Sequence, residues 1–264
     1  MDFNEAILKE EFFKLKREIS AQIELIDLTQ KSHLQKYLYF VYYPLFSLAE
    51  SIIILCDNGK DHSAKILLRS LIEAHINIIY HQVADSEYRL SLSAKGGFDI
   101  KAKNIKGLKD LIRRYPNLRS TDPTKLFSEK WLDNAGEWVD IERQAILKGN
   151  SLKETDQELD LLSKAIKCDE AHIKNAESGH FQRMYHIIFR QLSPTAHLNI
   201  EGIQTFVDEK EAGKYFFTDS DDSNLLISEA IDICVALTKD LYECGVLEGN
   251  IPDTADKIEK LIVR

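Results

Sequence analysis

The chain has 264 residues and a formal net charge of −9 at pH 7. This length is enough to bury a hydrophobic core without disulfides or metals. The acidic balance opposes general binding to nucleic acid, because phosphates attract Lys and Arg, but it leaves room for a small, locally basic site. Glycine (11) and proline (5) are scarce, which favours long helices and opposes a β-sandwich.

The first 85 residues predict three helices. Apolar residues recur at helical spacing through Asp2–Gln30, so this segment predicts a long amphipathic helix. Ser32–Cys56 is rich in Tyr and Phe and contains Pro44, which predicts a bent core helix rather than a membrane span. His62–Val83 is apolar on nearly every face, which predicts a central position in a helical bundle.

A more polar stretch, about 86–177, predicts a helical insertion in this bundle. Within it, Thr124–Lys148 is a predicted helix with Trp131 and Trp138 on one face. Ser151–Ala176 is a second predicted helix, and it opens on a capping-box pattern.

The remainder of the chain returns to the bundle. Phe181–His197 predicts a helix, and Ser220–Leu247 predicts a final long one. Thr205–Thr218 leaves open both a small β-hairpin and a helix end followed by a loop. We therefore expect an all-α protein of one domain, with a core of about 1–85 and 178–250.

The cysteines and histidines predict no metal site. Each cysteine lies in a helix-like stretch and no two have CxxC spacing, so buried thiols are expected at Cys56, Cys168, Cys234 and Cys244. No His pair has the spacing of a zinc site, and no glycine-rich phosphate loop is present, so we expect neither metal nor cofactor. The charged N-terminus lacks the apolar region of a signal peptide, so we expect a cytoplasmic protein without a membrane partner.

The segment His180–Ile200 carries the candidate chemistry. Polar side chains share one stripe of this predicted helix at about 100° per residue: Arg183, His186, Arg190, Ser193 and His197. Apolar side chains lie roughly opposite: Met184, Ile188, Leu192 and Ala196. Pro194 lacks a backbone donor and clashes with the carbonyl of Arg190, so the helix is expected to bend or break there.

These residue types suit RNA cleavage. The reaction needs one group to take the 2′-hydroxyl proton and one to protonate the leaving oxygen, and histidine titrates in the range where it can do either. Arginine can hold a phosphate through two hydrogen bonds and stabilise its developing charge. His197 is therefore the candidate acid or base, Arg190 the phosphate ligand and Ser193 a further donor. The alternative is a solvated helix face with an ordinary proline bend.

Arg190 and His197 are separated by six residues, which resembles the R-x4-6-H signature of the HEPN superfamily (higher eukaryotes and prokaryotes nucleotide-binding). The helix His62–Val83, with Arg69 and Glu73, is similar to the LxRxxxE helix of a large bacterial helical family of unknown function that has been compared with HEPN proteins. In that family a later segment ends in His, and the matching residues here are Phe189, Leu192, Ser193 and His197. The resemblance covers about 45–85 and 180–250, and it departs from the pattern at Gln191 and Pro194.

The resemblance implies an all-α HEPN-like bundle and a metal-independent endoribonuclease, the effector of a toxin–antitoxin or phage-defence system. It also implies RNA as substrate, a cognate protein partner, and dimers whose motif helices face each other. Arg69 and Glu73, at i and i+4, would form a buried ion pair that fixes helix register, or Glu73 would orient Arg190 or His197. Asn77 and His186 are further supporting candidates.

Two other functions stay open. A HEPN-like binding or scaffold module, antitoxin or sensor without catalysis predicts a buried or salt-bridged Arg190. A partner in nucleotide binding or nucleotidyl transfer is also known among HEPN proteins.

Overall fold

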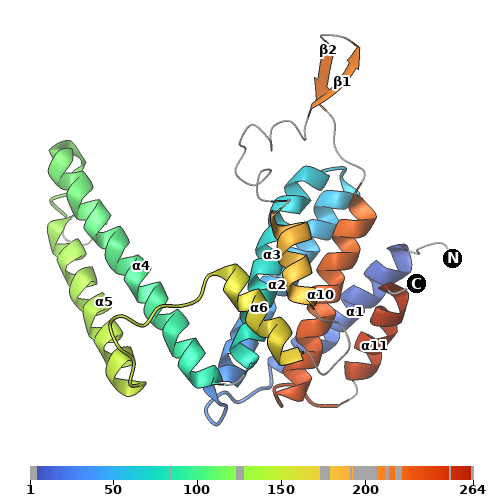
Figure 1. Cartoon of the computed structure of the whole chain (residues 1–264), viewed down its shortest axis with the longest axis horizontal. Helices are drawn as coiled ribbons and strands as arrows, with labels where there is room; N and C mark the ends of the chain where they lie inside the picture. Colours follow the sequence, from blue (N-terminus) through green and yellow to red (C-terminus); the bar gives the residue numbers. More distant parts are fainter. Residues whose placement is uncertain are drawn as a thin grey trace. The chain divides into compact units, whose positions relative to one another are not determined.

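A computed structural model describes residues 5–83, 85–122, 128–172, 179–190, 192, 207–211, 214–217, 222–249 and 251–262. Helices dominate the described residues, which confirms the all-α expectation, and one two-stranded sheet accompanies them (Figure 1). The chain divides into two compact units, Met1–Val83 with Leu161–Arg264, and Ala84–Asp160. The predicted insertion, about 86–177, overlaps most of the second unit, but 161–172 belongs to the first.

The first unit is a helical bundle. Its helices α2 and α3 pack along each other, α10 packs on both, and α11 packs on α1 and α10. Fully buried side chains such as Phe12, Phe46 and Leu71 form one continuous core, whose burial is the main stabilising term. The bounds are α1 (Glu5–Ile23), α2 (His33–Asp57), α3 (Asp61–Gln82), α6 (Leu161–His172), α10 (Ser223–Glu243) and α11 (Ile251–Ile262).

Helix α2 has a complete capping box at its start. The Ser32 hydroxyl oxygen accepts a hydrogen bond from the Gln35 N–H, and the Gln35 side-chain oxygen accepts one from the Ser32 N–H. By length and composition, α2 is the one described helix apolar enough to cross a membrane. A core helix meets the same criterion, and α2 buries Leu38, Phe46 and Ile53 while packing on α3 and α10.

A small hairpin precedes α10. Strand β1 (Val207–Glu211) pairs antiparallel with β2 (Lys214–Phe217), with Val207 opposite Phe217. The register shifts between Glu209 and Glu211, as in a bulge. Of the two conformations that the sequence left open here, the chain adopts the hairpin.

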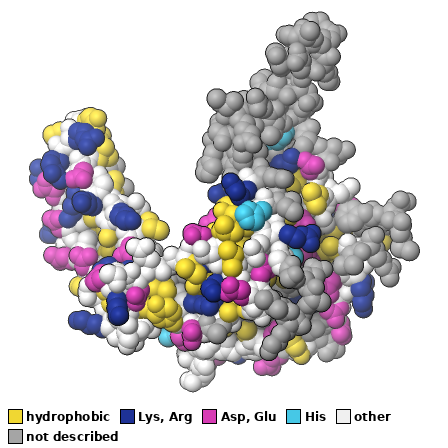
Figure 2. Space-filling model, in the orientation of Figure 1, with side chains coloured by type: hydrophobic (Ala, Val, Ile, Leu, Met, Phe, Trp, Pro, Cys, Tyr) yellow, Lys and Arg dark blue, Asp and Glu magenta, His cyan; other side chains and the backbone are white. Residues whose placement is uncertain are grey.

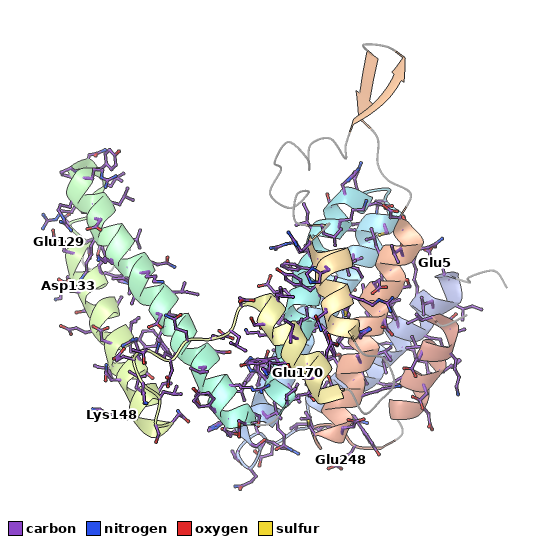
Figure 3. All side chains as sticks on the ribbon, in the orientation of Figure 1. Glu5, Glu129, Asp133, Lys148, Glu170 and Glu248 are labelled. Atoms are coloured by element: carbon purple, nitrogen blue, oxygen red, sulfur yellow. The ribbon has the colours of Figure 1, made fainter. Side chains whose placement is uncertain are left out.

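The second unit is built on two long helices, α4 (Ser86–Arg114) and α5 (Glu129–Gly149), which pack on each other; their side chains are drawn in Figure 3. A short 3-10 helix, η1 (Pro116–Leu118), follows α4. Buried Leu92, Leu147 and Leu152 form a small core near one end.

The helix predicted over Ser151–Ala176 begins instead at Leu161. Ser151 has φ of 55°, in the left-handed region that a helix interior excludes. Glu154 accepts hydrogen bonds from Arg143 instead of capping a helix, and the Asp156 carbonyl accepts one from Lys95. Contacts with α4 and α5 therefore hold this segment in an irregular conformation that its local pattern did not predict.

Candidate functional site

The predicted motif helix begins as α7 (His180–Arg183) and continues as a π-helical segment, η3 (Met184–Phe189). The N-cap residue, Gly179, has no side chain that could cap this helix. Asp169 of α6 replaces it: its carboxylate accepts hydrogen bonds from the backbone N–H of Phe181 at 2.9 Å and of Gln182 at 3.0 Å. Because Asp169 is buried, this charge-assisted contact fixes the start of the motif helix against α6.

The motif helix buries apolar side chains and exposes basic ones. Phe181, Met184, Phe189 and Leu192 are buried, whereas Arg183, His186 and Arg190 are exposed. The predicted division into a core side and a polar side is therefore confirmed over the described residues. Ser193 and His197, and the bend expected at Pro194, lie outside the described residues. Single π-helical turns are rare and occur often at functional sites.

We call Arg183, His186 and Arg190 the basic face. All three side chains are exposed. Figure 2 shows Lys, Arg and His side chains beside hydrophobic ones on the visible side of the first unit. Exposed cations can attract a phosphate even on a chain with net negative charge.

Arg69 connects α3 to the π-helical segment. Its guanidinium carbon lies 4.4 Å from the centroid of the Phe189 ring, a cation–π geometry. Its Nη1 is 3.9 Å from the Glu73 carboxylate, and the Arg69 and Glu73 side chains are 22% and 48% exposed. The expected ion pair of Arg69 and Glu73 is therefore present, but it is partly exposed and not buried.

Asn77 links α3 to α6. Its side-chain oxygen accepts a hydrogen bond from Lys164 Nζ at 2.6 Å, and its amide nitrogen donates to the Glu73 carbonyl at 2.9 Å. Lys164 also lies 5.5 Å from the Tyr80 ring centroid. Asn77 thus helps to hold α6, which in turn caps the motif helix. No pattern in the sequence predicted a role for this lysine, which is buried.

A buried histidine packs against the first turn of the motif helix. His75 on α3 is 5% exposed, and its ring contacts Phe181 edge-on with centroids 5.7 Å apart. Its Nδ1 has no hydrogen-bond partner among the described residues. Burial, with a smaller effect from the nearby His180, lowers the pKa of His75 to about 4. His75 is therefore neutral at pH 7 and packs in the core between α3 and the motif helix.

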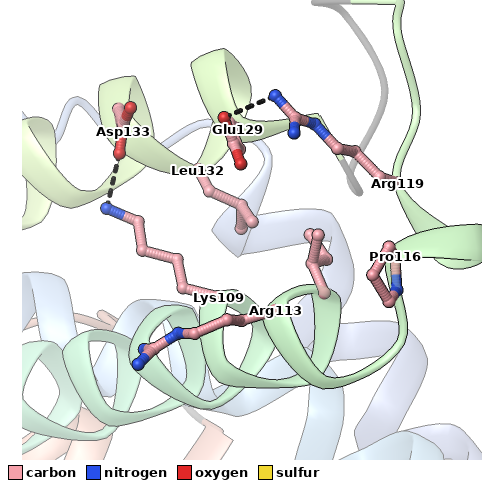
Figure 4. Close-up of a pocket in the computed structure, with 8 residues that line it drawn as sticks. Lys109, Arg113, Pro116, Arg119, Glu129, Leu132 and Asp133 are labelled. Atoms are coloured by element: carbon pink, nitrogen blue, oxygen red, sulfur yellow. Dashed lines mark hydrogen bonds and ion pairs between the residues drawn. The ribbon is translucent and has the colours of Figure 1, made fainter.

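The second unit contains a separate charged pocket of about 420 Å³ (Figure 4). Lys109 binds Asp133 at 2.6 Å, and Arg119 binds Glu129 at 2.7 Å. The third cation lining it, Arg113, pairs with Asp110. Since each cation is already neutralised, this pocket is a weaker anion site than the basic face. Among the residues that the structure describes, no group of His, Cys, Asp and Glu is arranged to hold a metal ion.

Comparison with known families identifies the chain. Residues 35–215 match a family described as "Family of unknown function (DUF5677)", and this match covers more than half of the sequence. The chain belongs to the DUF5677 family. The matched region runs from α2 through the second unit and the basic face to β2, so both units are part of the DUF5677 pattern. No curated protein and no solved structure matches the chain.

Proposed function

We propose that this DUF5677 protein is a HEPN-like, metal-independent endoribonuclease and the effector of a toxin–antitoxin or phage-defence system. The observation that supports this proposal most is the exposure of Arg190 on a face with Arg183 and His186. A binding module without catalysis would instead bury Arg190 or pair it with a carboxylate. The basic face offers what phosphate recognition requires, namely accessible cations.

In the proposed reaction the ribose 2′-oxygen attacks the adjacent phosphorus and the bond from phosphorus to the 5′-oxygen breaks. One proton leaves the 2′-hydroxyl and one is delivered to the 5′-oxygen. His197 exchanges one of these protons, and Arg190 binds the phosphate oxygens, on which negative charge accumulates. Ser193 donates a hydrogen bond to the same phosphate. These roles follow the R-x4-6-H resemblance.

Residues outside this set position it. Arg69 packs on Phe189, one residue before Arg190, and Asp169 anchors the other end of the segment. Both contacts restrain the motif helix relative to α3 and α6, and geometry held in this way reduces the cost of orienting a substrate. The same proposal places the protein in the cytoplasm, with RNA as substrate and a cognate protein that keeps it silent.

Expression in a bacterial host tests the proposal. The wild type should slow growth and fragment total RNA, and His197→Ala and Arg190→Ala should abolish both effects. Arg17→Ala and His33→Ala are matched controls, because both residues are exposed on the first unit and lie outside the motif. Cleavage by purified protein should persist in EDTA if no metal takes part.

Two results would count against the proposal. If the purified wild type binds RNA without cutting it, the chain is a binding module. If the two motif variants cut as fast as Arg17→Ala and His33→Ala, the motif is not the active site.

A further inference from the structure

The segment 101–119, which runs from the second half of α4 through η1, is strongly basic. It contains seven Lys or Arg residues and one carboxylate, Asp110, and so carries a net charge of +6. The whole chain carries −9, so the remainder of the sequence carries −15. Such a concentration of one sign creates a local positive potential on a protein that as a whole repels polyanions.

Three of these seven cations are engaged by α5. Lys109 and Arg119 each bind a carboxylate of α5, and Figure 4 shows both side chains reaching towards that helix. The Lys101 Nζ lies 5.2 Å from the centroid of the Trp138 ring. These three side chains therefore contribute to the contact between the two helices of the hairpin.

The other four cations lie away from α5. Ile112 is buried and marks the side of α4 that packs on α5. At about 100° per residue, Lys103 and Arg114 fall opposite Ile112, and Lys106 and Arg113 fall on one flank between. All four are exposed. We call Lys103, Lys106, Arg113 and Arg114 the α4 stripe.

The α4 stripe is accessible and keeps a positive charge along its length. Asp110 lies within it and pairs with Arg113, which leaves a net charge of +3. At Gly107, on the same side, an added side-chain carbon would meet no described atom within 4 Å. At about 1.5 Å per residue, about 16 Å separate Lys103 from Arg114 along the helix axis. This length can follow several phosphates, which are about 3.4 Å apart along each strand of a duplex.

Helix stability does not account for the α4 stripe. The helix dipole favours cations only in the last turn, which explains Arg113 and Arg114 but not the two lysines. Like charges at i and i+3 destabilise a helix, and Lys103, Lys106 and Lys109 follow this spacing. The stripe therefore weakens its own helix slightly, and a bound polyanion would remove that repulsion.

An exposed tyrosine stands at the end of the α4 stripe. Tyr115 directly follows Arg114, forms the C-cap of α4 and is 50% exposed. Single strands present unstacked bases, which stack on aromatic rings of this kind while neighbouring cations bind the phosphates. Phosphate-binding cations beside an accessible ring favour a nucleic-acid strand over an acidic protein.

We propose that the α4 stripe and Tyr115 bind single-stranded RNA, at a site that contains none of the motif residues. The cations bind phosphates of the strand, and the Tyr115 ring stacks on a base. RNA and DNA share phosphates and bases, so the choice of RNA rests on the proposed function. The α4 stripe then adds affinity for the strand that the motif cuts.

Fluorescence anisotropy of the full-length protein with a labelled single-stranded RNA tests this site. His197→Ala is the background of every variant, so that cleavage does not consume the RNA. Lys103→Gln with Lys106→Gln should weaken binding by about five-fold or more. It should also lower the slope of log Kd against log salt concentration by about 1.4, since each phosphate contact of a single strand contributes about 0.7.

The matched control is Lys148→Gln with Lys153→Gln. It removes the same charge at two exposed sites of the second unit outside the α4 stripe, and it should leave both the affinity and the salt slope unchanged. Circular dichroism checks that each variant keeps its helices.

The stacking contact has a different signature. Tyr115→Ala should weaken binding by about ten-fold at an unchanged salt slope, because it removes a stacked base but no charge. Tyr115→Phe keeps the ring and should bind like the background protein. An RNA affinity that neither Tyr115→Ala nor the stripe variant changes would overturn the proposal.

Three further results would also overturn it. An equal loss in the stripe variant and in its matched control would show that overall charge, not the α4 stripe, sets the affinity. Polyglutamate that competes as well as unlabelled RNA would assign the stripe to an acidic protein. A DNA strand of the same sequence that binds more tightly than the RNA would exclude RNA as the ligand.

Failure of the proposed ribonuclease activity is a separate result. If the unaltered chain binds RNA through the α4 stripe without cutting it, the site stands and the ribonuclease proposal is wrong. If the unaltered chain cuts RNA and the stripe variant binds as tightly as its background, the ribonuclease proposal stands and the site is wrong.

Discussion

The guanidinium of Arg69 lies over the ring of Phe189, with its central carbon 4.4 Å from the ring centroid. The two residues are 120 positions apart in the chain, and their contact joins the central helix of the bundle to the π-helical segment that precedes Arg190. Because Arg69 is partly exposed, the contact can be altered without leaving a buried charge unpaired.

Arg69→Ala should lower the free energy of unfolding by about 1 kcal/mol, since it removes the cation–π contact and the packing of the arginine stem. RNA cleavage should fall with it, because Phe189 and Arg190 lose a restraint. Arg69→Lys should keep the charge but lose the planar stacking. Its stability and its cleavage rate should therefore lie between those of the wild type and Arg69→Ala. Urea unfolding and a cleavage assay measure both effects. Full activity in Arg69→Ala would show that Arg69 has no part in positioning the motif.

Asp169→Ala should destabilise the first unit by about 1–2 kcal/mol, because the N–H groups of Phe181 and Gln182 lose their shared acceptor. Asp169→Asn should cost less, since its side-chain oxygen can still accept one of these bonds. Glu170→Ala is the control, because Glu170 is the exposed neighbour on the same helix. Hydrogen exchange of the amides of α7 should accelerate in Asp169→Ala alone; unchanged exchange would show that the cap does not hold this helix.

The spacing of apolar and polar residues within single helices predicted which of their side chains are buried and which are exposed. Arg183 and Arg190 are exposed and Met184 is buried as the helical spacing required, and Trp131 and Trp138 line one groove. In each case a single helix decides which side chains face its neighbours.

Contacts between distant segments account for the differences. Asp169 caps a helix that begins eleven residues later, and no spacing rule connects them. Glu154 had the spacing of a capping box, but the competing partner Arg143 lies on another helix. The π-helical segment also differs from the prediction, because a 3.6-residue periodicity predicts an α-helix. The roles of Ser193 and His197 rest on the R-x4-6-H pattern, and they stay predictions.

His75 should make stability fall as the pH is lowered. Its pKa is about 4 in the folded protein because the side chain is buried, whereas in the unfolded chain it is about 6.5. Between these values the unfolded state binds the proton and the folded state does not, so the free energy of unfolding drops as pH falls from 6.5 towards 4. Protonation of this histidine in the unfolded chain should lower the free energy of unfolding by about 2 kcal/mol between pH 7 and pH 5.

Comparison with His75→Asn isolates that loss. Burial raises the pKa of Asp232, so this carboxyl acts in the opposite direction, but it is present in both proteins and cancels in the difference. The variant should lose less stability than the wild type between pH 7 and pH 5 in urea titrations, and His33→Asn, at an exposed site, should behave like the wild type. Equal pH dependence in all three proteins would contradict a buried, neutral His75.

Lys95 joins α4 to the irregular segment that follows α5. Its Nζ donates to Asp99 and to the Asp156 carbonyl, each at 3.0 Å, and the residue is 3% exposed. Lys95→Met fills a similar volume but leaves that carbonyl without its donor, so the second unit should lose about 1–3 kcal/mol of stability. Lys106→Met, at an exposed site, is the control. Hydrogen exchange in 86–160 measures the loss locally.

The same variant should also change the titration of Asp99. Burial alone would raise the pKa of this carboxyl, but hydrogen bonds from Arg143 and Lys95 outweigh it, so the pKa lies below its ordinary value. These contacts stabilise the folded state above about pH 4, and the contribution is lost as pH falls through the lowered pKa. Lys95→Met should move the Asp99 pKa upward, and Arg143→Met should move it further, because Arg143 is the stronger of the two partners. Carboxyl titration by NMR distinguishes these outcomes. An Asp99 pKa that is the same in wild type and Lys95→Met would show that Lys95 serves the backbone of the 150–160 segment alone.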